Sequence, residues 1–140
     1  MNNKKALEKF ICFYEEFNIN NKELFEEVYA KDIVFKDPFH YFQGRENLYQ
    51  YFVRLMEKVK NCQFSILESI EKNDTAVVIW RMTFNHPAMN KNQPIEVYGA
   101  SHLKIDEQIY YHRDYFDSSE LIYRNIPFIG SFVRYIEGRF

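Results

Sequence analysis

The sequence predicts a single α+β domain in which helices come first and an antiparallel sheet follows. Apolar residues of the first 60 positions recur at helical spacing, whereas those of residues 62–117 alternate as in strands. The strand-like segments are joined by short links, which favours an antiparallel meander. Helices followed by strands are typical of the α+β class. A chain of 140 residues is long enough for one domain with its own core.

Three helices are expected before the sheet. The first, at residues 5–18, has apolar side chains at helical spacing, which are Leu7, Phe10, Ile11, Tyr14 and Phe17, and Phe13 widens this stripe. A short second helix is expected at residues 22–30, after asparagines that can cap it. The clearest pattern lies in residues 45–60, after Gly44. Its apolar residues form one face of a long amphipathic helix and include Leu48, Tyr51, Phe52 and Leu55.

Residues 33–40 are expected to form a short strand that ends on a carboxylate. Val34 and Phe35 are good strand formers, and Pro38 stops the hydrogen-bond ladder because it has no N–H. Asp37 would then lie at a strand end among aromatic side chains, where apolar surroundings disfavour the charged form. Asp37 is therefore a candidate proton-transfer group. The alternative is an aspartate in an ordinary surface turn.

Four strands are expected at residues 62–71, 75–85, 95–105 and 109–117, followed by a helical tail. The tail, residues 118–140, is strongly apolar on one side and is interrupted by Pro127 and Gly130. So large an apolar face calls for a partner. We therefore expect the tail to act as a lid over the domain or as a dimer element, and a membrane contact has little support because the tail has few basic residues.

Composition narrows the classes of function. The net charge is −2 and the charges are interspersed, which gives no nucleic-acid footprint. No apolar run approaches the length of a membrane span, and the amino-terminal run lacks the apolar core of a signal peptide. Cys12 and Cys62 are expected to be small buried side chains in a reducing compartment. A cytoplasmic protein is therefore expected, with no metal site because no His, Cys or Asp spacing fits one.

The order of these elements, with an apolar-x-Asp-Pro motif after the first strand and a glycine before the long helix, resembles the nuclear transport factor 2-like superfamily. The run His112-Arg113-Asp114-Tyr115-Phe116-Asp117, with Leu121, Tyr123, Ile126-Pro127 and Gly130, is similar to a bacterial branch of its SnoaL-like group. The resemblance covers nearly the whole chain up to about Asp117. It implies a cone-shaped α+β barrel, in which three N-terminal helices pack on a curved antiparallel sheet around an aromatic pocket. The domain would comprise residues 1–140, with 118–140 as a C-terminal helical extension.

Ketosteroid isomerase, one member of the superfamily, uses the aspartate of its Asp-Pro motif as a shuttling base, with an oxyanion hole made by a tyrosine and a protonated aspartate. Carried over by position, the base falls on Asp37, the tyrosine falls on Phe13 with Tyr14 one place along, and the acid falls near Ser101. The resemblance thus implies a base without its oxyanion hole. We do not expect an efficient steroid isomerase, because one such donor contributes roughly 10²–10³ in rate.

In the SnoaL-like cyclases a carboxylate on the last strand is the acid/base, which corresponds to Asp114. Strand alternation places His112, Asp114 and Phe116 on one face. The predicted catalytic residues are therefore Asp37, Asp114 and His112. The alternative for His112 and Asp114 is a structural His–Asp bond, or an ion pair of Asp114 with Arg113 or Arg81. The predicted ligand-binding residues are those expected to line the pocket, namely Phe13, Tyr14, Phe39, Tyr51, Phe52, Trp80, Met82, Ser101 and Phe116.

The resulting prediction is a small-molecule pocket protein that isomerises, cyclises or dehydrates a hydrophobic carbonyl compound by general acid/base chemistry, without a cofactor. The alternative is a module of the same fold that binds a hydrophobic ligand without turnover, or that serves as a dimeric interaction domain. The expected partners are a hydrophobic small molecule and a second copy of the chain.

Overall fold

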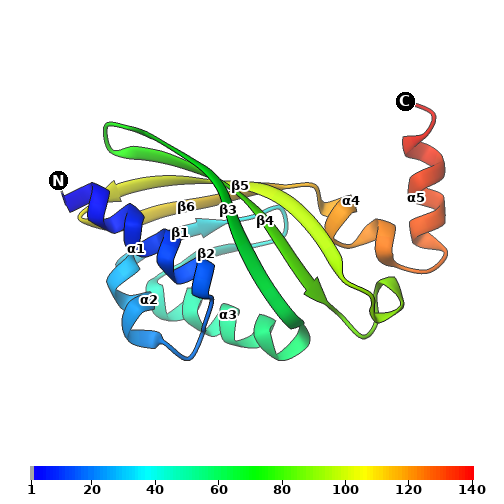
Figure 1. Ribbon diagram of the computed structural model, residues 1–140, viewed down its shortest axis with the longest axis horizontal. Helices are drawn as coiled ribbons and strands as arrows, with labels where there is room; N and C mark the ends of the chain where they lie inside the picture. Colours follow the sequence, from blue (N-terminus) through cyan, green and yellow to red (C-terminus); the bar gives the residue numbers. More distant parts are fainter. Residues whose placement is uncertain (1) are drawn as a thin grey trace.

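The fold is a curved six-stranded sheet with helices packed on its concave side (Figure 1). The computed structural model describes residues 2–140, so Met1, the first residue of the predicted 1–140 domain, lies outside it. The strand order is β2-β1-β6-β5-β4-β3. The strands are β1 (Tyr29–Lys36), β2 (Tyr41–Gln43), β3 (Lys60–Lys72), β4 (Thr75–Asn85), β5 (Ile95–Asp106) and β6 (Gln108–Phe116). The predicted cone-shaped α+β class is confirmed.

Three helices precede the sheet meander, as predicted. They are α1 (Asn2–Glu16), α2 (Lys22–Val28) and α3 (Arg45–Lys58). The side-chain oxygen of Asn21 caps α2 by accepting from the Leu24 N–H at 3.2 Å. The inward faces of these helices supply Phe10, Phe25 and Leu48 to a fully buried core. The helices close one side of the sheet, and the side chains between them and the sheet form the cavity described below.

The sheet is mixed, which corrects the expectation that it is antiparallel throughout. β3, β4, β5 and β6 form the predicted antiparallel meander, but β1 pairs in parallel with β6, with Lys36 opposite Arg113. Because the two strands run in the same direction, Asp37 and Asp114 lie at the same end of the sheet. The short strand β2, which pairs with β1, was not predicted because three residues are too few to show an alternating pattern.

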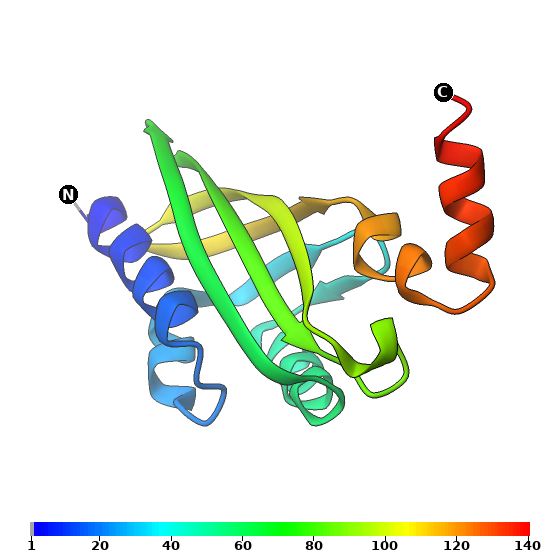
Figure 2. The same ribbon diagram turned by 45° about the vertical axis from the view of Figure 1, so that its right-hand side comes forward.

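The C-terminal extension has two parts with different surroundings. It comprises α4 (Ser118–Leu121), a 3₁₀ turn η2 (Tyr123–Asn125) and α5 (Ile129–Glu137). Leu121 and Ile122 line the cavity, whereas α5 stands away from the sheet in both views (Figures 1 and 2) and is held to η2 by an ion pair between Arg124 and Glu137.

The outward face of α5 is apolar and exposed. Its large exposed side chains are Ile129, Phe132, Tyr135 and Ile136, and Phe128, directly before the helix, is exposed as well. Because Leu121 and Ile122 are the part of the tail that lines the cavity, a lid would lie there. The lid, the homodimer and the cytoplasmic location stay predictions. Within residues 2–140, no helix is both long enough and apolar enough to cross a membrane.

Candidate active site

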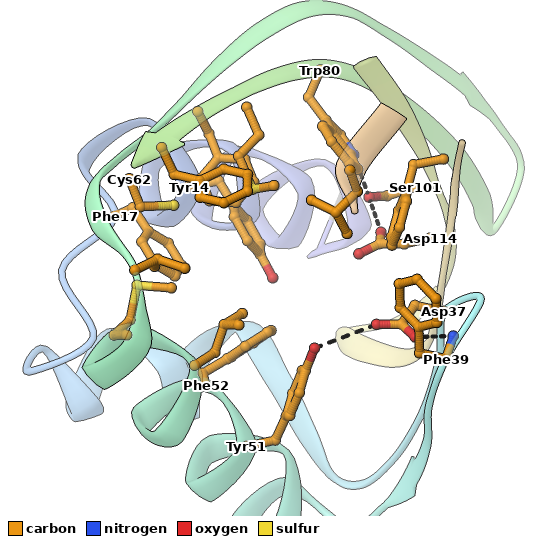
Figure 3. A pocket seen from close by; sticks show the side chains of 18 of the residues that line it. Tyr14, Phe17, Asp37, Phe39, Tyr51, Phe52, Cys62, Trp80, Ser101 and Asp114 are labelled. Atoms are coloured by element: carbon orange, nitrogen blue, oxygen red, sulfur yellow. Dashed lines mark hydrogen bonds between the residues drawn. The ribbon is translucent and has the colours of Figure 1, made fainter. Parts of the chain in front are cut away.

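A cavity of about 250 Å³ lies between the concave face of the sheet and the helices. Its walls are mainly aromatic and aliphatic. All nine predicted ligand-binding residues except Phe13 line it, namely Tyr14, Phe39, Tyr51, Phe52, Trp80, Met82, Ser101 and Phe116. The three predicted catalytic residues line it as well. Figure 3 shows Asp37, Tyr51, Ser101 and Asp114 gathered on one side, here called the polar end, with Phe17 and Cys62 on the opposite side.

Phe13 lies outside the cavity, although it occupies the position of the oxyanion tyrosine in ketosteroid isomerase. It is 1% exposed and packs edge-on against Phe25, with ring centroids 5.8 Å apart. Adjacent residues of a helix point about 100° apart, so Phe13 and Tyr14 face different surroundings. Tyr14 is the one that lines the cavity, and its hydroxyl points inwards (Figure 3).

His112 is the centre of a buried hydrogen-bond chain. Its side chain is 1% exposed. The Nε2 atom lies 2.6 Å from Asp114 Oδ1, and Nδ1 lies 2.9 Å from Tyr29 Oη. The Tyr29 hydroxyl is in turn 2.7 Å from Tyr14 Oη. The hydrogen-bond chain therefore connects Asp114 and Tyr14 through His112, which also lines the cavity, and through Tyr29, which is buried behind it.

Ser101 and Trp80 fix the carboxylate of Asp114 from β5 and β4. The indole Nε1 of Trp80 lies 2.9 Å from Ser101 Oγ, and an indole N–H can only donate. The Ser101 hydroxyl therefore keeps its own proton for Asp114 Oδ1, at 2.6 Å. Oδ1 thus accepts from both Ser101 and His112, while Oδ2 makes no hydrogen bond within residues 2–140 and points into the cavity (Figure 3).

The position of Trp80 depends on Gly99 in the neighbouring strand. A Cβ atom added at Gly99 would lie 2.3 Å from Cη2 and 2.4 Å from Cζ2 of the indole. Real side chains do not approach so closely. Only glycine leaves room for the indole to lie against β5 and reach Ser101.

Asp37 is anchored by the turn that follows β1. Its Oδ1 accepts from the backbone N–H groups of Phe39 at 2.8 Å and His40 at 2.7 Å. The His40 ring lies 3.1 Å from the same oxygen, and Tyr51 donates to Oδ2 at 3.5 Å. These are the contacts of a carboxylate that holds a turn and a tyrosine, which is the alternative to a free base. Its side chain is 6% exposed.

The ion-pair alternatives for Asp114 are not present. The Arg113 guanidinium lies over the ring of Tyr115, 4.7 Å from its centroid, and the Arg81 side chain reaches Ser65 Oγ at 3.4 Å. The structural His–Asp bond is present. The second carboxylate oxygen takes no part in that bond and faces the cavity (Figure 3).

Three tyrosines of this site keep their protons. Burial raises the pKa of Tyr14 well above its ordinary value, and the charge of Asp114 raises it further. Burial, followed by the neighbouring Tyr14, raises the pKa of Tyr29. The pKa of Tyr51 is raised by burial and then by the charge of Asp37. All three are neutral hydroxyls at neutral pH, so each is available as a hydrogen-bond donor.

Because of Cys62, the free energy of unfolding is expected to fall as the pH becomes alkaline. Burial in the cavity wall raises the pKa of its thiol to about 12, against roughly 8.5 in an unfolded chain. The folded state therefore keeps a proton that the unfolded state loses. This contribution is complete below about pH 8.5, declines as the pH rises towards 12, and is smaller by about 2 kcal/mol at pH 10.

Urea unfolding at pH 7 and pH 10 measures this effect. Cys62→Ala should lose about 2 kcal/mol less stability between the two pH values than the unsubstituted chain. Cys12→Ala is the matched control, because Cys12 is exposed on α1 rather than buried as expected. Equal losses in the two variants would contradict the prediction.

Tyr29 is the member of the hydrogen-bond chain that the sequence did not single out as a candidate. Its apolar neighbours gave it the pattern of a core side chain, and it is indeed 0% exposed. Its hydroxyl meets His112, which lies 83 positions along the chain. No local pattern reports such a contact.

Among the described residues, no group of three or more His, Cys, Asp and Glu side chains is arranged to hold a metal ion.

The fold and the cavity define a small pocket protein with the nuclear transport factor 2-like architecture. The SnoaL-like domain family matches residues 12–112. The chain therefore belongs to the SnoaL-like domain family. No curated protein sequence matches it.

Solved structures share the fold at low sequence identity. An NTF2-like protein of unknown function from Burkholderia pseudomallei superposes with a TM-score of 0.76 at 15% identity, covering 91% of this chain and 98% of that one. A Catenulispora acidiphila protein with a ketosteroid isomerase-like fold gives 0.71 at 18%, with 84% and 88% covered. An LEH-like epoxide hydrolase from M. tuberculosis gives 0.68 at 14%, with 85% of each chain covered. Such similarity establishes the fold.

Proposed function

We propose that this protein is an acid/base enzyme that moves a proton within a hydrophobic carbonyl compound. The observation that carries the proposal is the asymmetry of the Asp114 carboxylate. Oδ1 is fixed by His112 and Ser101, whereas Oδ2 faces an apolar cavity (Figure 3). A carboxylate oxygen held in place and open to a ligand is the arrangement that a general base requires.

The first step of this chemistry is a proton transfer. Asp114 Oδ2 takes the hydrogen from the carbon next to the carbonyl group, and the electron pair of that C–H bond forms the enolate. Return of the proton from Asp114 to another carbon isomerises the compound. If Asp114 instead returns the proton to a departing β-hydroxyl group, water is released and the compound is dehydrated. If the enolate carbon attacks a second carbonyl group, a ring closes and the proton passes to the new alkoxide oxygen. A positioned base contributes about 10²–10⁴ in rate to the first step.

The cavity supports a compact, uncharged ligand. Its volume of about 250 Å³ lies just below the 300–1,000 Å³ range that is usual for pockets of drug-sized ligands. The polar end holds the two carboxylates of Asp37 and Asp114, which would repel an anionic compound. An aromatic or alicyclic ketone fits both conditions. In this assignment Asp37 is a positioning residue that fixes Tyr51 and the turn.

Deuterium exchange tests the proposal without knowledge of the natural substrate. The probe is 2-tetralone, a bicyclic ketone whose α-hydrogens exchange slowly with D₂O and are counted by ¹H NMR. The protein should accelerate exchange saturably. Trp80 is the single tryptophan of the chain and lines the cavity, so its fluorescence reports binding separately. Binding without accelerated exchange would contradict catalysis and favour the ligand-binding alternative.

A further inference from the structure

We propose that Tyr14 is a second catalytic residue, a general acid that receives its proton from His112 through Tyr29. The structure connects the three groups in series, with 2.7 Å between the two tyrosine hydroxyls and 2.9 Å between Tyr29 Oη and His112 Nδ1. The acid role rests on the proposed function, because it needs a carbonyl oxygen in the cavity. The proton path from His112 to Tyr14 does not depend on the proposed function.

The protonation state of His112 sets the direction of the hydrogen bonds that join His112, Tyr29 and Tyr14. With His112 neutral, the short contact to the carboxylate places the ring proton on Nε2, since an ionised Asp114 can only accept. The bare Nδ1 then accepts from Tyr29, and Tyr29 accepts from Tyr14. In this state the Tyr14 oxygen offers only lone pairs to the cavity.

One added proton on His112 exchanges donor and acceptor in the His112–Tyr29 and Tyr29–Tyr14 hydrogen bonds. When His112 is an imidazolium, both ring nitrogens donate, so Nδ1–H donates to the Tyr29 oxygen. Tyr29 is 0% exposed, and Tyr14 is the one other hydrogen-bond partner of its hydroxyl within residues 2–140. Tyr29 must therefore donate to Tyr14, and the Tyr14 proton turns towards the cavity. Tyr14 can therefore donate to a ligand in the cavity only when His112 holds the additional proton.

Asp114 and Tyr14, the two ends of this hydrogen-bond series, then act together on a ligand in the cavity. Asp114 Oδ2 removes the α-hydrogen of a ketone while Tyr14 delivers its proton to the carbonyl oxygen, which gives a neutral enol. Tyr14 recovers a proton from Tyr29, and Tyr29 recovers one from His112 Nδ1. The protein gains one proton at Asp114 and loses one at His112, so its charge does not change. No free oxyanion forms, because Tyr14 protonates the carbonyl oxygen. Tyr14 thereby replaces the hydrogen-bond donor that Phe13 cannot provide.

The surroundings of His112 let this path operate. The rings of Phe10 and Phe35 pack against the imidazole, with centroids 5.4 and 4.9 Å away, and the side chain of His112 is 1% exposed. The titratable groups facing it are Tyr14 from α1, Tyr29 from β1 and Asp114 from its own strand; Ser101 is the polar group from β5. Asp37, Tyr51 and Cys62 stand further along the same cavity.

NMR of the ligand-free protein tests the reversal directly. With ¹³Cζ-labelled tyrosine and ¹⁵N-labelled histidine, the Tyr14 and Tyr29 signals should shift with the same pH midpoint as His112 Nδ1. In Tyr29→Phe the His112 signal should still titrate while the Tyr14 signal no longer follows it. Tyr115→Phe, at an exposed position on the outer face, is the control and should leave the coupled titration unchanged.

Three results would overturn the reversal. They are a Tyr14 signal that stays flat through the His112 titration, a Tyr14 signal that still follows His112 in Tyr29→Phe, and an imidazole that keeps one state wherever the protein is folded.

The exchange of 2-tetralone tests the acid role. The wild-type rate should fall as rising pH removes the His112 proton, whereas Tyr14→Phe and Tyr29→Phe should be slower by about 10²-fold and independent of that titration. A wild-type rate in Tyr14→Phe would remove Tyr14 as the acid. If the wild-type protein accelerates no exchange, the proposed function and the acid role fail together, while the NMR titration still decides the proton path.

Discussion

Asp114→Asn is expected to lower the rate of 2-tetralone exchange by about 10²–10⁴-fold without unfolding the protein. The asparagine side-chain oxygen can still accept from His112 Nε2 and from the Ser101 hydroxyl, so the contacts at Oδ1 are kept. The amide nitrogen, in the position of Oδ2, cannot take a proton from carbon. The rate is measured by ¹H NMR in D₂O, and fluorescence of Trp80 shows whether the ketone still binds.

Two matched variants decide what the Asp114→Asn result means. Asp37→Asn should slow exchange less, because the carboxyl oxygens of Asp37 already bond to its own turn and to Tyr51. Asp106→Asn removes an exposed carboxylate at the end of β5 and should have no effect. If Asp37→Asn loses as much as is expected of Asp114→Asn, and Asp114→Asn exchanges at the wild-type rate, the base is Asp37.

Gly99→Ala is expected to destabilise the fold by about 3 kcal/mol, the upper end of what overpacking costs. The added methyl group would overlap a rigid indole at 2.3 Å, and Trp80 is 5% exposed, so the indole could move only by entering the cavity that it lines. Displacement of the indole would also break its bond to Ser101 Oγ. Urea unfolding gives the change in free energy, and 2-tetralone exchange shows the loss of a correctly held Asp114.

Gly138→Ala provides the control for that experiment. A Cβ at Gly138 would meet its nearest atom at an ordinary 3.4 Å, and its φ of −66° suits alanine. This variant should be neutral or slightly more stable. Equal stability of Gly99→Ala and the unsubstituted chain would mean that the indole has freedom to move, and the account of how Asp114 is fixed would be wrong.

The order and type of most elements could be predicted because each depends on a local pattern. The face of α3 is visible in the spacing of Leu48 and Phe52, and both side chains are buried. The alternation of residues 75–85 matches β4 without a shift. Resemblance added the cone shape, which no local pattern contains. The parallel contact of β1 with β6 was not predicted, because pairing between distant strands leaves no trace in either strand alone.

The candidate site was predictable to the level of positions but not of partners. Strand alternation was enough to place His112 and Asp114 on one face. It could not show that the Tyr29 hydroxyl would contact His112, or that Asp37 would accept hydrogen bonds from the backbone of its own turn. Side-chain hydrogen bonds depend on atoms that meet only in three dimensions. The same limit explains why Phe13 was included and Tyr29 was not.

The parallel contact between β1 and β6 also governs when in folding the polar end can form. Lys36 pairs with Arg113, so the loop that closes contains most of the chain, and the entropy of that closure is lost before the contact is made. The β3–β6 meander needs only short-range closures, which are intrinsically faster. We therefore expect Asp37 and Asp114 to meet after the meander has formed, so that the polar end of the cavity is completed late in folding.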